Sequence, residues 1–87
     1  NENVYSYETF FDKYINECVC PEDRLMMQQA LQFDNVMETL SGKKEYKGNY
    51  RIIKEDKIQY YQFRFIRDEE SGIIVLGFLN VDLNGWT

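Results

Sequence analysis

The segment from Ile73 to Val81 constrains the fold more than any other part of the sequence, because it is apolar on both faces of a strand. Successive side chains of an extended chain point to opposite faces. One face carries Ile73, Val75, Leu79 and Val81, and the other carries Ile74, Leu76 and Phe78. A strand of this kind normally lies inside a sheet that is covered on both sides. It is also the last strand that the sequence predicts, so we expect at least one of its neighbours to lie outside these residues.

Length and composition limit the chain to one globular domain, residues 1–87, with one modest core. Aromatic residues make up 16 % of the chain and charged residues 29 %, a balance typical of folded proteins. The net charge of −5 would repel a phosphate backbone, so we expect no nucleic-acid partner. No apolar run approaches the roughly 20 residues of a membrane helix, and we expect no membrane contact by this segment.

The two cysteines, Cys18 and Cys20, are separated by one residue, and a disulfide closing so small a ring would be strained. We therefore expect free thiols in a reducing, cytoplasmic compartment. Histidine is absent, which removes the usual general base and the usual nitrogen ligand of metals and haem. The chain begins at Asn1 instead of Met, so we expect it to be a segment of a longer protein.

Helices are expected over about residues 7–41. Ser6 is a suitable N-cap for a first helix from Tyr7 to about Asn16, in which apolar side chains recur four residues apart. Pro21, followed by two acidic residues, predicts the start of a second helix. Asp34 could end that helix and cap a further turn or two, from Asn35 to Leu40, before Gly42 stops it as a C′ residue.

Strands follow at about residues 45–55, 58–68 and 72–82. The first alternates apolar and polar side chains, Glu55-Asp56-Lys57 makes a tight connection, and Gly72 supplies the positive φ of a polar hairpin loop. The predicted fold class is α+β, with the N-terminal helices packed against an antiparallel three-stranded meander.

Catalytic interpretations find little support, and we expect this segment not to be an enzyme. No Ser–His or Cys–His pair can form without histidine. Cys18 and Cys20 lack the C-x-x-C spacing of redox and zinc sites, and small buried hydrophobes are a better interpretation than a reactive pair. The acidic loop 68–70 could bind Ca²⁺ or Mg²⁺, but it lacks an Asp-x-Asp-x-Asp-Gly arrangement, so a solvated turn is favoured. Glu22 and Asp23 could be paired catalytic carboxylates, yet capping the helix already accounts for them.

Two features of the strands lean further toward function. Gly48 and Gly77 interrupt strands, where glycine usually marks a bulge or the close approach of another group. The stripe of Tyr61, Phe63 and Phe65 could line a ligand cavity or face a partner, although such stripes more often belong to a plain core.

Four segments, in order, resemble the PAS family of sensory domains. Pro21-Glu22-Asp23-Arg24 is similar to the family's H-P-E-D-R motif, with Cys20 where histidine is usual, and Tyr46-x-x-x-Tyr50-Arg51 is similar to its Y-x-x-E-Y-R strand. The segments 60–68 and 77–82 resemble its next strand with hairpin and its closing strand. The resemblance covers about residues 10–82 and is nearest to PAS modules that precede GGDEF-type diguanylate cyclase domains in Firmicute signalling proteins.

The resemblance implies a five-stranded antiparallel sheet whose first two strands precede the helices and are lacking here. The last strand is central in that family, which would explain why residues 73–81 are apolar on both faces. The light-sensing subgroup's flavin-binding cysteine motif is not present, and a chain without histidine cannot supply the usual haem ligand, so no cofactor is expected. After Asp82 the family usually continues into a charged linker, whereas Leu83-Asn84-Gly85 looks like a stop.

The leading hypothesis is a non-catalytic sensory module of a bacterial signalling protein, in which a small ligand biases one of two arrangements and alters an output domain in the same parent chain. The candidate cavity-facing residues are the inward-looking apolar positions Phe11, Ile15, Leu31, Tyr50, Phe63 and Phe78.

The alternative hypothesis is a ligand-free interaction domain that forms a homodimer through the open edge of its last strand. The candidate interface residues are Ile74, Leu76 and Phe78. Residues Asn1 to Tyr5 could instead fold back to shield part of that edge, but we favour the second copy.

Overall fold

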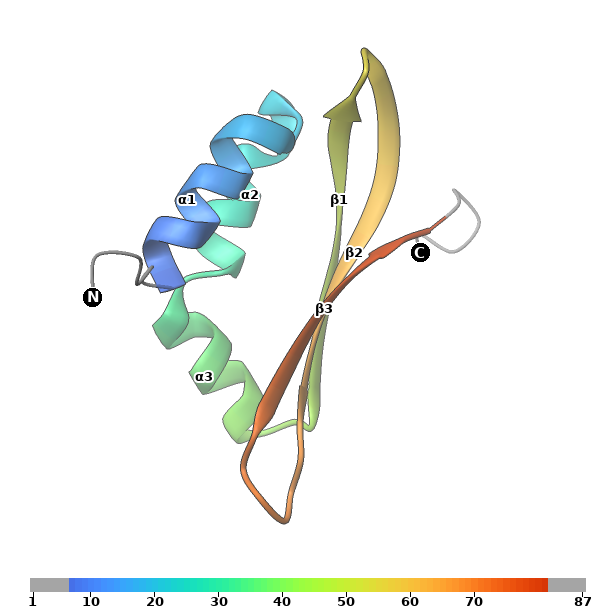
Figure 1. Ribbon diagram of the computed structural model, residues 1–87. Helices are drawn as coiled ribbons and strands as arrows, with labels where there is room; N and C mark the ends of the chain where they lie inside the picture. Colours follow the sequence, from blue (N-terminus) through green and yellow to red (C-terminus); the bar gives the residue numbers. More distant parts are fainter. Residues whose placement is uncertain (1–6, 82–87) are drawn as a thin grey trace, which may run out of the picture.

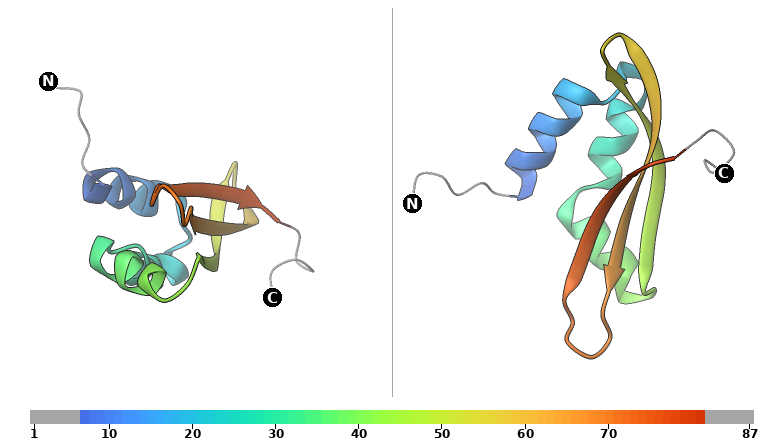
Figure 2. Two further views of the ribbon diagram at one scale, coloured as in Figure 1. Left: turned by 90° about the horizontal axis from the view of Figure 1, so that it is seen from below. Right: turned by 45° about the vertical axis from the view of Figure 1, so that its right-hand side comes forward.

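The computed structural model describes residues 7–81 and confirms the α+β fold class, with the helices N-terminal to the sheet (Figure 1). Three helices come first, α1 (Tyr7–Cys18), α2 (Pro21–Ala30) and α3 (Phe33–Ser41). The strands β1 (Glu45–Lys54), β2 (Lys57–Arg67) and β3 (Ile74–Asn80) then form an antiparallel sheet in the order β1-β2-β3. All three helices lie on one side of the sheet, so the described part of the molecule has two layers (Figure 2).

The helix boundaries differ from the predicted ones in three places. Helix α1 continues to Cys18, beyond the predicted end at Asn16. The break between α2 and α3 falls at Leu31–Gln32, and Gln32, not Asp34, is the N-cap of α3. Gly42 is the C-cap of α3, but its φ of −108° shows that it does not adopt the left-handed C′ conformation. The predicted N-cap Ser6 lies outside the described residues.

Side chains from later in the sequence explain why α2 stops where it does. The amide of Asn35 donates to the carbonyl oxygen of Ala30 at 2.9 Å, and the hydroxyl of Tyr46 donates to the same oxygen at 3.1 Å. These two bonds satisfy a carbonyl group that the end of a helix would otherwise leave unpaired. The break therefore depends on a strand residue that a local sequence pattern does not include.

Both hairpin connections have the predicted character. Glu55 and Asp56, with φ of 53° and 63°, form a two-residue loop between paired Lys54 and Lys57, as a type I′ turn requires. In the second connection Gly72 has a φ of 75°, and the carboxylate of Asp68 accepts bonds from the backbone N–H and hydroxyl of Ser71. The loop is thus held by its own acidic residue.

The core lies between the helical layer and the inner face of the sheet. Its buried hydrophobic residues come from all three helices, the connections before and after α2, and strands β1 and β2: Phe11, Ile15, Val19, Met27, Leu31, Val36, Leu40, Tyr50, Ile52, Phe63 and Phe65. Strand β3 contributes the partly buried Ile74, Leu76 and Phe78 to the same cluster. Phe63 and Phe65 of the predicted stripe are therefore core, as the plainer interpretation predicted, and the partly buried Tyr61 packs against that core.

The two strand glycines have different surroundings. A Cβ atom on Gly48 would lie 2.5 Å from the ring of Phe63, so this glycine allows the close approach of an aromatic side chain, as predicted. A Cβ atom on Gly77 would meet nothing within 4 Å, so Gly77 borders open space.

Strand β3 is an edge strand of the sheet formed by the described residues. Its outer face is not covered, since Val75 is 60 % exposed and Leu79 is 40 % exposed. The expectation of cover on both faces is therefore wrong for these residues alone, because every described helix packs on the inner face.

None of the helices within residues 7–81 is long and apolar enough to cross a membrane.

Candidate functional site

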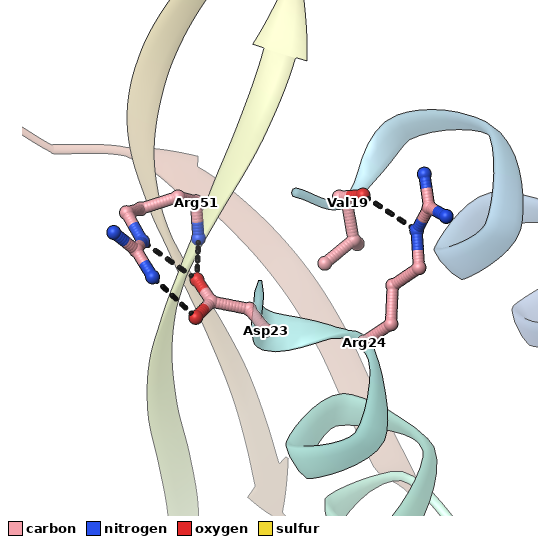
Figure 3. A network of polar contacts seen from close by, with 4 residues as sticks. All are labelled: Val19, Asp23, Arg24 and Arg51. Carbon is pink, nitrogen blue, oxygen red and sulfur yellow. Dashed lines mark hydrogen bonds and ion pairs between the residues drawn. The ribbon is translucent and has the colours of Figure 1, made fainter. Parts of the chain in front are cut away.

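The best-defined polar contact joins the start of α2 to strand β1. The carboxylate of Asp23 accepts three bonds from Arg51: from the backbone N–H at 2.9 Å, from Nε at 2.9 Å and from the terminal Nη2 at 2.8 Å (Figure 3). The Asp23 side chain is 13 % exposed and that of Arg51 is 32 % exposed. A two-point contact of this kind between guanidinium and carboxylate fixes orientation as well as distance.

The loop between α1 and α2 brings these two residues together. Pro21 at the first turn of α2 presets the helical φ, and the N–H of Cys20 donates to the carbonyl of Arg51 at 2.9 Å. Val19 forms an isolated antiparallel bridge with Ile52 beside it. Arg24 donates from Nε to the carbonyl of Val19 at 3.0 Å and so holds the loop from the helix side (Figure 3).

The electrostatics of this contact are those of a structural ion pair. The bonds from Arg51 hold the pKa of the Asp23 carboxyl below its ordinary value. Burial raises the pKa of the Cys20 thiol, which disfavours the reactive thiolate. Both cysteines are free thiols, and Cys20 is buried, in agreement with the interpretation as small hydrophobic residues.

Aromatic side chains meet where α1 crosses the sheet. The hydroxyls of Tyr14 and Tyr50 lie 2.5 Å apart, and the ring of Tyr14 lies 5.2 Å from that of Phe78. Phe11 contacts the same Phe78 ring at 6.0 Å. Tyr50 is fully buried, and this burial is the main cause of its raised pKa. Helix α1 is therefore attached to β1 by a hydrogen bond and to β3 by ring contacts.

The structure brings the predicted cavity residues together, but as packed core. Phe11, Ile15, Leu31, Tyr50 and Phe63 are each at most 4 % exposed. Phe78 is partly buried and borders a surface hollow of about 290 Å³ on the outer face, beside Gly77 and Leu79. None of the other five lines this hollow.

A different hollow, which we call the basal hollow, lies between the helical layer and the sheet. It measures about 260 Å³ and is lined by Tyr7, Phe33, Val36, Met37, Phe65, Ile74 and Leu76. The Tyr7 hydroxyl is buried and has no hydrogen-bond partner among the described residues, and burial raises its pKa to about 12. An apolar hollow of this kind is suited to a small apolar ligand.

Sequence reasoning missed the basal hollow because its lining comes from α1, α3, β2 and β3 at once. The available signal was the position of Phe33 and Met37, four residues apart on one short helix and both partly exposed. Two predicted interface residues, Ile74 and Leu76, belong to its lining.

The side chains of the predicted interface residues point toward the helices. Ile74, Leu76 and Phe78 are partly buried against the core, while the exposed apolar side chains of β3 are Val75 and Leu79. Any edge contact by Ile74, Leu76 and Phe78 would therefore use mainly their backbone groups.

No group of three or more His, Cys, Asp or Glu side chains within residues 7–81 could hold a metal ion. Comparison of the chain with protein-family models, curated proteins and solved structures gave no match.

Proposed function

We propose that the chain is a non-catalytic sensory or regulatory module of the PAS type, which binds a small apolar ligand in the basal hollow. The observation that carries this proposal is the apolar hollow itself, which is lined by side chains of both layers.

The contact between Asp23 and Arg51 supports the family assignment within this proposal. Asp23 belongs to the P-E-D-R segment and Arg51 to the Tyr50-Arg51 segment, and the 28-residue separation between them includes the rest of α2 and all of α3. Two of the segments on which the resemblance depends thus meet through three hydrogen bonds.

The proposed mechanism is a population shift. The basal hollow lies between α1, α3 and β3, so a ligand there contacts both layers. If it binds better to one arrangement of the layers, it raises the population of that arrangement. The shift would be transmitted to an output domain in the same cytoplasmic parent protein, for which a GGDEF-type diguanylate cyclase is the class that the resemblance implies.

Native mass spectrometry of freshly purified protein tests the proposal. We expect a co-purifying small molecule, whose retention is lost in Met37→Trp, because the indole fills the hollow. Met26→Trp is the matched control, since Met26 is an equally exposed helical methionine (41 % against 39 %) that does not line the hollow.

Tyr7→Phe is a conservative control for the lining of the hollow. Removing a buried hydroxyl that a molecule in the hollow does not reach should leave both the free energy of unfolding and the retention of ligand nearly unchanged. Repeated absence of any bound molecule in the wild type, or equal retention by Met37→Trp and Met26→Trp, would refute the proposal.

A further inference from the structure

The outer edge of β3 presents unpaired backbone groups. The N–H of Asp68 donates to the carbonyl of Ile73 and the N–H of Val81 donates to that of Tyr60, which fixes the hydrogen-bonding phase of the β2–β3 pair. Odd-numbered residues of β3 therefore bond to β2, and the N–H and C=O groups of the even-numbered Ile74, Leu76 and Phe78 point away from it. No strand within residues 7–81 pairs with them.

The opposite edge of the sheet is protected in a way that β3 is not. On β1, the N–H of Arg51 donates to Asp23 and its C=O accepts from Cys20. Proteins commonly blunt exposed edges with charged residues or proline. From Ser71 to Val81, however, the sequence has neither a charged residue nor a proline, although the chain carries a net charge of −5.

We propose that a second copy of this chain pairs with β3 in antiparallel orientation, about a two-fold axis at Gly77. In this register Leu76 exchanges backbone hydrogen bonds with Phe78 of the second copy, and Ile74 does so with Asn80. Gly77 faces its own counterpart in a non-bonded pair, where Cα atoms approach to about 4.5 Å.

Self-complementary side chains favour this occupant. On the outer face Val75 comes opposite Leu79 of the second copy, so two exposed aliphatic pairs form by symmetry. The 290 Å³ hollow beside Gly77 gives their side chains room. Strand β3 has no charged side chain, so the negative net charge of the two copies is not concentrated at the contact.

A charge-pairing experiment tests both the contact and its register. Val75→Lys combined with Leu79→Lys places like charges opposite each other twice, and should raise the dimer dissociation constant about a hundredfold in sedimentation equilibrium. Val75→Lys combined with Leu79→Glu places opposite charges together and should restore most of the association. Leu25→Lys with Ile58→Lys is the control, because both residues are exposed and neither belongs to β3.

Amide exchange measured by NMR identifies what covers the edge. In the dimer the amides of Ile74, Leu76 and Phe78 should be protected, and dilution should expose them while those of Val75 and Leu79 stay protected by β2. A monomer at all concentrations overturns the proposal, and protected even-numbered amides in that monomer would assign the edge to another segment of the same chain. A dimer whose even-numbered amides exchange freely overturns it as well. These outcomes do not involve the basal hollow, so they are independent of ligand binding.

Discussion

The carboxylate of Asp23 binds both the side chain and the backbone N–H of Arg51, with three donor–acceptor distances between 2.8 and 2.9 Å. Asp23, at the start of α2, thereby holds β1 in position and satisfies a backbone N–H on the outer edge of that strand. Because the loop residues Val19 and Cys20 also pair with β1, the contact determines how the helical layer is seated on the sheet.

Removing this carboxylate should loosen that seating. We expect Asp23→Ala to lower the free energy of unfolding in urea by about 2 kcal/mol at neutral pH, because charged hydrogen bonds are lost in a partly buried site. Glu22→Ala is the matched control, as Glu22 is exposed in the same helical turn, and its cost should be at most about 0.5 kcal/mol. Equal effects of the two substitutions would show that Asp23 acts only on the helix dipole.

The same pair predicts a pH dependence. The pKa of Asp23 is lowered in the folded state, so its contribution to stability is complete above the unfolded value of about 3.9 and disappears as the pH falls through the folded pKa. The difference in stability between the wild type and Asp23→Ala should therefore shrink below about pH 4. A constant difference down to the most acidic measurable pH would contradict the assignment of the shift to Arg51.

The hydroxyl pair of Tyr14 and Tyr50 should show an asymmetric mutational cost. Tyr14→Phe leaves the hydroxyl of the fully buried Tyr50 without a partner and should cost about 1–2 kcal/mol. Tyr50→Phe should cost less, because the Tyr14 side chain is only partly buried whereas Tyr50 is fully buried. The double variant should be less destabilised than the sum of the two, and strict additivity in urea unfolding would show that the bond contributes nothing.

Glycine positions give a test of packing in the sheet. Gly48→Ala should destabilise the chain by about 1–3 kcal/mol, because the new methyl group would overlap the ring of Phe63. Gly77→Ala, the control, should be neutral or stabilising by up to about 1 kcal/mol, since it meets nothing within 4 Å. The melting temperatures of both variants, measured at low concentration, test this prediction. A Gly48→Ala variant as stable as the wild type would mean that the Phe63 ring moves freely.

Sequence patterns predicted the strands closely because alternation and turn residues are local. The polar pair Glu55-Asp56 and the positive-φ Gly72 mark both connections, and the strand ends agree with the predicted ones to within two residues. The helix break was displaced because it depends on Asn35 and Tyr46, which reach the end of α2 from other elements.

The candidate site was harder to predict than the fold. An acidic residue in a first helical turn is sufficiently explained by the helix dipole, so nothing local indicated that Asp23 binds Arg51, 28 residues away. The apolar positions chosen as a cavity are the ones that pack best, and they close the space between them. The basal hollow lies between α1, α3, β2 and β3, whose side chains do not fill the space between them. Its presence depends on how these elements are placed relative to one another, which a local sequence pattern does not show.

Lysine substitutions at two neighbouring residues of β3 should differ strongly in their effect on the stability of the fold. Leu76→Lys places an ammonium group on the inner face against the core and should leave the chain unfolded or insoluble. Val75→Lys places it on the outer face, where the side chain is 60 % exposed, and should change the free energy of unfolding by no more than about 0.5 kcal/mol at concentrations where the chain is monomeric. Circular dichroism shows whether each variant is folded, and urea unfolding gives its free energy of unfolding. A folded, soluble Leu76→Lys variant of ordinary stability would mean that β3 does not pack its even-numbered side chains on the helices, which would overturn both the placement of the basal hollow and the orientation of the open edge.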